Sequence, residues 1–150
     1  MRSLHKYLLV FVLIHCGIVY ADDIPKVSRY FTGSLQGVSF SGKQFTVSWQ
    51  YSEYDGRKAD KWAGGDSLEP PHYVVQNISL EVAGKKVSIP NSAYYDVYDP
   101  AVYAQGPYLM EDKSNMYLII NASDGAGSAE IWLKVQDGKY IGRDVKWGEY

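Results

Sequence analysis

Hydrophobic and polar side chains alternate with a period of two along several short stretches of the chain. In the clearest example, polar side chains separate Phe45, Val47, Trp49 and Tyr51. Residues 130–136 repeat the pattern, with Trp132 on the face opposite Ile131, Leu133 and Val135. A period of two puts alternate side chains on opposite faces of a β-strand. Both stretches therefore predict half-buried strands, with Trp49 in the core and Trp132 on an outer face.

Short turns containing glycine join the predicted strands into hairpins. Gly42-Lys43 separates candidate strands 35–40 and 45–51, and Gly84-Lys85 separates 72–82 from 86–89. Asp137-Gly138 separates 130–136 from 140–147, where Trp147 is also expected to face the core. Residues 115–122 form a further candidate strand. Glycine adopts the positive φ that tight hairpin turns require.

No stretch shows a sustained helical period of 3.6 residues. We therefore predict an all-β fold, a small antiparallel sandwich or curled meander sheet of about seven strands with two long loops. In the strand 72–82, Val74 is expected to share a face with Ile78 and Leu80, and Gln76 interrupts that face.

The two long loops run over residues 53–71 and 91–113. In the second, Ser92–Tyr98 is compatible with a short helical turn that begins at Ser92 and ends at Asp99-Pro100. Loops of this length in a small domain are typically functional or mobile. They are therefore the first places to look for a binding surface.

The N-terminal residues have the order of features typical of a secretory signal peptide. A basic start with Arg2 and Lys6 precedes a mostly apolar run from Tyr7 to Tyr20, and Ala21 offers a small residue for cleavage. We therefore predict a signal peptide over 1–21, a single antiparallel β domain over 22–150, and a secreted or periplasmic location. This arrangement is similar to that of small exported bacterial proteins.

The same apolar run is not expected to span a membrane. His15 and Gly17 interrupt it, and it is shorter than the roughly 20 apolar residues that a membrane helix needs. Cys16 could in principle carry a lipid anchor. However, His15 occupies the position before the cysteine where a small residue is expected, so lipid attachment is a minor alternative.

Composition and charge exclude several classes of function. The net charge of −2 provides no basic field for nucleic acid. Removal of residues 1–21 would leave no thiol and His72 as the sole imidazole, too few ligands for a zinc site. We predict no cofactor and no metal. Calcium is disfavoured because the acids of the first loop are interspersed with cations and lack the spacing of a known calcium loop.

Catalytic chemistry also has few candidates. The chain lacks a Gly-x-Ser-x-Gly motif, and only His72 could complete a triad in the mature chain. We therefore predict that the protein is not an enzyme and assign no catalytic residue. A small hydrolase that uses His72 or a pair of carboxylates is retained as an alternative.

Aromatic residues make up 15% of the chain, with 14 Tyr and 4 Trp, and many lie in the predicted loops. Tyrosine and tryptophan combine a large apolar area with a polar tip, which suits recognition surfaces and loop packing alike. The candidate ligand-binding residues are Trp62, Tyr94, Tyr95, Tyr98, Tyr103, Tyr108 and Trp132.

These residues suggest a non-enzymatic exported β domain that binds a protein or a cell-envelope component through its aromatic loop surface. The principal alternative is a carbohydrate-binding module in which Trp62 and Trp132 stack against sugar rings.

Overall fold

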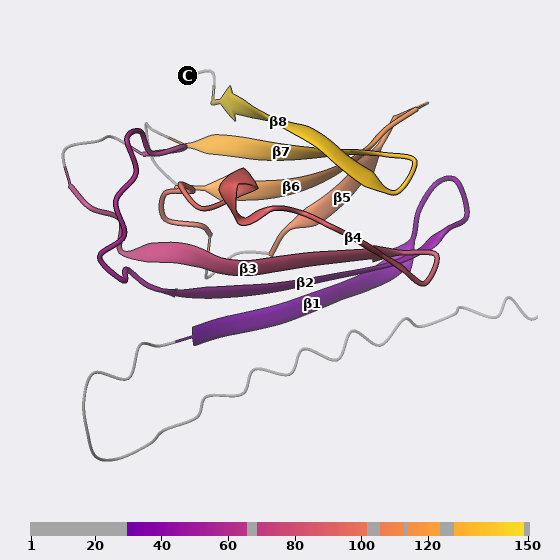
Figure 1. Ribbon diagram of the computed structural model, residues 1–150, viewed down its shortest axis with the longest axis horizontal. Coiled ribbons are helices and arrows are strands. Elements are labelled where there is room, and N and C mark those ends of the chain that lie inside the picture. The colour runs from indigo at the N-terminus through magenta and orange to yellow at the C-terminus, as the bar shows by residue number, and fades with distance from the viewer. Residues whose placement is uncertain (1–29, 66–68, 102–105, 113, 124–127, 149–150) are drawn as a thin grey trace, which may run out of the picture.

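The computed structural model describes residues 30–65, 69–101, 106–112, 114–123 and 128–148. The predicted signal peptide therefore lies outside the described residues. Two antiparallel four-stranded sheets, each with its strands in chain order, face each other (Figure 1). The first contains β1 (Tyr30–Val38), β2 (Gln44–Glu53), β3 (Tyr73–Val82) and β4 (Lys85–Val87). The second contains β5 (Tyr108–Glu111), β6 (Met116–Ala122), β7 (Ala129–Gln136) and β8 (Lys139–Trp147).

The predicted all-β antiparallel architecture is confirmed, with differences in detail. The additional strand, β5, lies inside the second predicted loop. Strand β1 begins at Tyr30 and ends at Val38, earlier at both ends than the predicted 35–40. The expected helical turn is a three-residue 3-10 helix, η1 (Asn91–Ala93), with Pro90 rather than Ser92 at its N-cap.

The core lies between the inner faces of the two sheets. Val47 and Leu80 from the first sheet and Leu118 and Leu133 from the second are completely buried in one cluster. Each such side chain contributes about 1.5–3 kcal/mol relative to exposure. The period-two pattern of β2 and β7 thus predicts the inward residues correctly.

The prediction for β3 is wrong at one end, because the strand contains a bulge. The register with β2 shifts between Gln50 and Tyr51, so that Gln76 has no opposite residue. An extra residue reverses which side chains face inward. As a result Val75, rather than Val74, joins Ile78 in the core cluster.

Glycines provide space for Trp49, a partly buried side chain that packs against the core cluster. A Cβ atom on Gly33 would lie 2.3 Å from the ring of Trp49, and one on Gly106 would lie 2.1 Å from the same ring. Trp49 is therefore held between β1 and the segment that enters β5. In contrast, Trp147 is 47% exposed, so its expected place in the core is wrong. It pairs with Ala129 at the far end of β8, an edge strand.

The connections give the sandwich two different ends. The turns of the β1–β2, β3–β4 and β7–β8 hairpins lie together at one end (Figure 1). Two of them, Ala83-Gly84 and Asp137-Gly138, have positive φ at both residues, as a tight type I′ turn requires. The described part of the first long loop lies at the other end (Figure 1).

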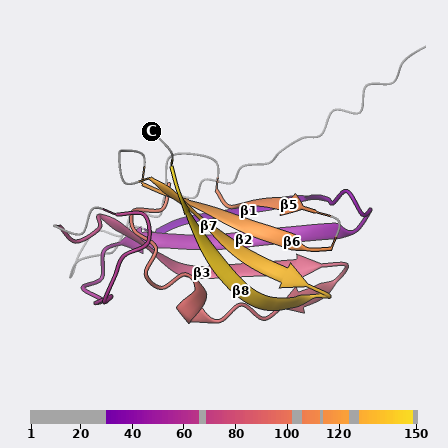
Figure 2. The same ribbon diagram turned by 90° about the horizontal axis from the view of Figure 1, so that it is seen from above.

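Side-chain contacts close both open sides of the sandwich. On one side, where Figure 2 shows β1 beside β5, the Glu111 carboxylate accepts hydrogen bonds from the N–H and hydroxyl of Ser41, at 3.1 and 2.8 Å. On the other side, Arg143 of β8 binds the Asp96 carboxylate with two hydrogen bonds, at 2.5 and 2.7 Å. Asp96 raises the pKa of Arg143 by accepting these bonds, so the arginine stays charged.

Candidate functional site

The two long loops meet at the end of the sandwich opposite the hairpin turns. Ala63 of the first loop and Val97 of the second form a parallel β-bridge. In that bridge Ala63 N–H donates to the Asp96 carbonyl at 2.8 Å, and Tyr98 N–H donates to the Ala63 carbonyl at 2.9 Å. Segments more than thirty residues apart therefore share one hydrogen-bonded framework.

A glycine pair allows the first loop to approach this closely. Gly64 has φ of +88°, and a Cβ atom there would lie 2.4 Å from Cβ of Ala122. A Cβ atom on Gly65 would lie 2.3 Å from the Tyr98 ring. Any other residue would push the first loop away from β6 and from the second loop.

Asp99 fixes the second loop to the start of β3. Its carboxylate accepts hydrogen bonds from the N–H groups of His72 and Tyr73, at 2.6 and 2.8 Å. The His72 ring nitrogen Nδ1 lies 3.2 Å from the same carboxylate, and the side chain is 79% exposed. No described hydrogen bond links this ring to a hydroxyl group, so the described contacts provide His72 with no nucleophile.

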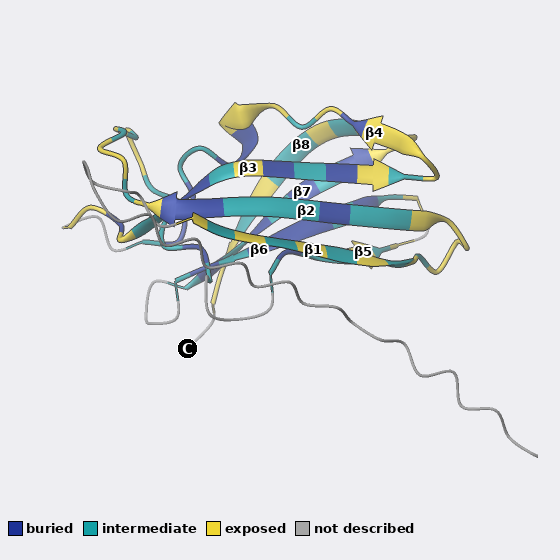
Figure 3. Cartoon of the chain, turned by 90° about the horizontal axis from the view of Figure 1, so that it is seen from below, coloured by how far each residue is buried: buried dark blue, intermediate teal, exposed yellow. Residues whose placement is uncertain are grey.

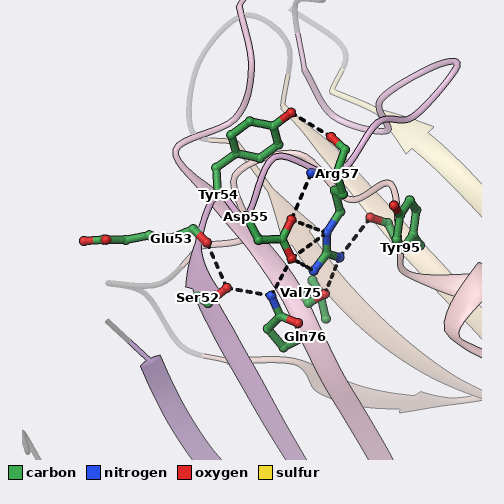
Figure 4. A network of polar contacts seen from close by, with 8 residues as sticks. All are labelled: Ser52, Glu53, Tyr54, Asp55, Arg57, Val75, Gln76 and Tyr95. Carbon is green, nitrogen blue, oxygen red and sulfur yellow. Dashed lines mark hydrogen bonds and ion pairs between the residues drawn. The ribbon is translucent and has the colours of Figure 1, made fainter. Parts of the chain in front are cut away.

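Among the described residues of the two loops, Arg57 has the most side-chain contacts (Figure 4). Its Nε and Nη2 donate to the Asp55 carboxylate, with the shortest contact at 2.6 Å. Its Nη1 donates to the carbonyl of Val75 at 2.8 Å and to that of Tyr95 at 3.4 Å. The guanidinium also lies 4.8 Å from the centre of the Tyr95 ring. Arg57 thus connects the first loop with β3 and the second loop.

The bulge residue Gln76 completes this network. Its side-chain amide donates to Asp55 at 2.9 Å and to the hydroxyl of Ser52 at 2.8 Å. The hydrogen bonds from Arg57, with a further one from Gln76, hold the pKa of Asp55 well below its ordinary value. Asp55 is therefore a permanently charged anchor at neutral pH and a poor general acid or base.

A shallow groove lies over this network. One hollow of about 690 Å³ is lined by Asp55, Gly56, Arg57, Gln76, Asn91, Tyr94 and Tyr95. A second, of about 540 Å³, is lined by Lys58, Ala59, Asp60, Lys61, Asn91, Ser92, Tyr95 and Asp96. Asn91 and Tyr95 line both, so the two hollows adjoin, and we call them together the loop groove. Its exposed charges are of both signs, from Asp55, Lys58, Asp60 and Lys61.

The structure divides the predicted aromatic residues into separate groups. Tyr94 and Tyr95 both line the loop groove, but Tyr94 is only 5% exposed and belongs to the core cluster, whereas Tyr95 is half-buried. Trp62 packs edge-on between Tyr54 and Tyr98, with ring centres 6.2 Å apart in both pairs. Tyr103 lies outside the described residues.

Tyr108 and Trp132 lie elsewhere, on the outer face of the second sheet. Both donate to the Glu130 carboxylate, from the Tyr108 hydroxyl at 2.9 Å and from Trp132 Nε1 at 2.8 Å. Burial, together with Glu130, raises the pKa of Tyr108 to about 12. The Lys146 ammonium lies 3.0 Å from the centre of the Trp132 ring, and Tyr117 packs edge-on against it at 5.2 Å. Trp132 is thus already engaged by its neighbours.

Sequence reasoning identified the two loops but missed the polar residues that organise them. Arg57, Gln76 and Asn91 were not among the candidates. The only local signals were the turn-forming Asp55-Gly56 before Arg57 and the interruption of an apolar face by Gln76. Within the described residues, no three His, Cys, Asp or Glu side chains are placed to hold a metal ion.

Comparisons with protein-family models, with curated proteins and with solved structures gave no match. In the described part of the chain, none of the helices is long and apolar enough to cross a membrane.

Proposed function

We propose that this chain is an exported, non-enzymatic binding domain that takes a protein or cell-envelope component at the loop groove. The observation that carries the proposal is the network around Arg57, which joins both loops to β3 beneath an open hollow. A groove whose walls are already ordered loses little conformational entropy when a partner binds. Export rests on the N-terminal sequence, whose cleavage after Ala21 can be checked by the mass of the purified chain.

The polarity of the groove favours a polar partner. Lys58, Asp60 and Lys61 are exposed along one hollow, and the Asn91 side chain borders both. Alternating charges of this kind suit an extended peptide segment that also carries both signs, because such pairing sets register and selects partners. Tyr95 adds an aromatic surface between the hollows.

A charge reversal at the groove tests the proposal. The double variant Lys58→Glu/Lys61→Glu should lose the partner that the unmodified chain captures, while its melting temperature stays close to that of the parent. The matched control is Lys85→Glu/Lys86→Glu, which makes the same charge change on β4, away from the groove. Retained capture by the groove variant, or equal loss in the control, would refute a specific role for the groove.

Carbohydrate binding is the second candidate, on the outer face of the second sheet. The cluster of Tyr108, Trp132 and Glu130 offers both aromatic surface and hydrogen-bonding groups. Because Lys146 lies over the Trp132 ring, a sugar that stacks there must displace it. Sugars that quench tryptophan emission should therefore bind more tightly to Lys146→Ala than to the parent. Trp132→Leu should abolish the quenching, and its persistence would exclude this platform.

A further inference from the structure

Among the strands that the structure describes, β1 is the one sheet edge that lacks the features that protect an edge from pairing with another strand. The edges of the two sheets are β1, β4, β5 and β8. Proteins protect such edges with short strands, charges, prolines or bulges. Strand β4 has three residues and β5 has four. Strand β8 carries four charged residues and a register shift.

In contrast, β1 is long, uncharged and regular. Its nine residues, Tyr30–Val38, include neither a charge nor a proline, and their pairing with β2 is unbroken. Within the described residues, no backbone hydrogen bond joins 32–38 to any segment other than β2. Figure 3 shows the exposed positions that alternate along this strand, and the two end residues, Tyr30 and Val38, are 56% and 65% exposed.

We propose that β1 pairs antiparallel with β1 of a second copy of this chain, about a two-fold axis at Ser34. Ser34 is the middle residue of the strand. The pair would join the first sheets of two copies into one continuous sheet. A two-fold interface brings the same patch of both subunits together, so each residue must be compatible with its counterpart.

The side chains of β1 are self-complementary in this register. On the inner face, Phe31 lies opposite the partner's Gly37, which Phe45 of that copy covers, and Leu35 lies opposite the partner's Gly33, which Trp49 of that copy covers. Each of these large side chains therefore meets an aromatic ring across the strand pair. On the outer face, Thr32 lies opposite the partner's Gln36, and the exposed Tyr30 lies opposite the partner's Val38. A shift by two residues in either direction would place glycine opposite glycine and lose this fit.

The absence of charge along β1 also favours a second copy over a charged peptide. In a two-fold antiparallel pair, a charge at the centre would face its own copy, and like charges on opposite residues destabilise a sheet. An interface of a single strand pair is small, at the weak and transient end of protein interfaces. We therefore expect a monomer–dimer equilibrium that depends on protein concentration.

Cysteine cross-linking tests the register directly. Cys16 is the only cysteine in the sequence, so a Cys16→Ser background carries no thiol. In that background Ser34→Cys should oxidise to a covalent dimer, because opposite Cα atoms in an antiparallel pair lie about 4.5–5.5 Å apart, within the separation that a disulfide spans. The matched control, Ser48→Cys, lies beside Ser34 on β2, one strand further in, and should form far less dimer.

Charge pairs provide the second test, by sedimentation over a range of concentrations. Thr32→Lys/Gln36→Lys should weaken the dimer about tenfold, since it places like charges opposite each other at two symmetric pairs. Thr32→Lys/Gln36→Glu alters the same positions but pairs opposite charges and should restore association. A parent chain that stays monomeric up to millimolar concentration would overturn the proposal. The proposal would also be overturned if the charge variants dimerised as strongly as the parent, or if Ser34→Cys and Ser48→Cys cross-linked equally.

Discussion

Replacement of Arg57 by leucine should destabilise the protein far more than the same change at its exposed neighbour Lys58. The Arg57 side chain is only 8% exposed and binds Asp55, the Val75 carbonyl and the Tyr95 carbonyl. Leucine keeps most of the apolar stem and removes every donor. The change therefore separates the polar contacts of this residue from its packing.

The expected loss is about 2–3 kcal/mol. Hydrogen bonds to charged groups contribute roughly 1.5–3 kcal/mol each, and a carbonyl that loses its donor adds a desolvation penalty. Against this, Asp55 is 35% exposed, so water replaces part of what the carboxylate loses. For a domain of this size the loss corresponds to a fall in melting temperature of about 10 °C. Lys58→Leu, at an exposed position, should change stability by less than about 0.5 kcal/mol.

The effect of Arg57→Leu should also depend on pH. The folded state holds the pKa of Asp55 well below the ordinary value of 3.8, chiefly through Arg57. A lowered carboxyl pKa stabilises the fold above that ordinary value, and this contribution disappears as the pH falls through the folded pKa. The difference in unfolding free energy between the parent and Arg57→Leu should therefore become smaller below pH 3.8.

Thermal melts followed by circular dichroism at several pH values measure both effects. Combining Arg57→Leu with Asp55→Asn gives a double-mutant cycle that measures the interaction free energy between Arg57 and Asp55. Equal destabilisation by Arg57→Leu and Lys58→Leu would refute the role assigned to this network. If the difference in stability between the parent and Arg57→Leu does not depend on pH, the ion pair with Asp55 is not the main contribution of Arg57 to stability.

Three further outcomes are expected. Gly33→Ala should lower stability by about 1–3 kcal/mol in denaturant unfolding, because the new Cβ overlaps the Trp49 ring, whereas Ser34→Ala should not. Glu111→Ala should accelerate amide hydrogen exchange at Ser41, whose N–H would lose its acceptor, and leave exchange in β7 unchanged. Glu130→Gln should lower the pKa of Tyr108 from about 12 in an ultraviolet phenol titration, and an unchanged titration would show that burial alone sets it.

The strands that sequence reasoning predicted well are those whose pattern is locally complete. In β2 and β7 the apolar side chains repeat every second residue, and these side chains face the core. In β1 two of the four inward positions are Gly33 and Gly37, which read as turn formers in isolation. Their role is apparent only beside Trp49 and Phe45, which occupy the space above them. This information lies on the neighbouring strand.

The loops show the same limit. The length of the loops predicts where a site could lie. The outward position of Trp132 follows from the alternation of side chains along its strand. That Tyr94 is buried in the core cluster while Tyr95 is only half-buried at the groove could not be predicted from two adjacent identical residues in an irregular segment. Likewise, the turn-forming Asp55-Gly56 precedes Arg57 but does not distinguish its role from that of Lys58. Its partners Val75 and Tyr95 come from two other segments, so its role depends on the tertiary fold.

The proposed dimer has a geometric consequence for the proposed groove. Strand β1 runs from the loop end of the sandwich toward the end with the hairpin turns (Figure 1). An antiparallel β1 pair therefore sets the loop end of one copy beside the hairpin end of the other. The two loop grooves would then open at opposite ends of the dimer. The two grooves of such a dimer cannot both bind one flat surface, so dimerisation should add little avidity toward it. Instead, the dimer should cross-link two soluble partner molecules.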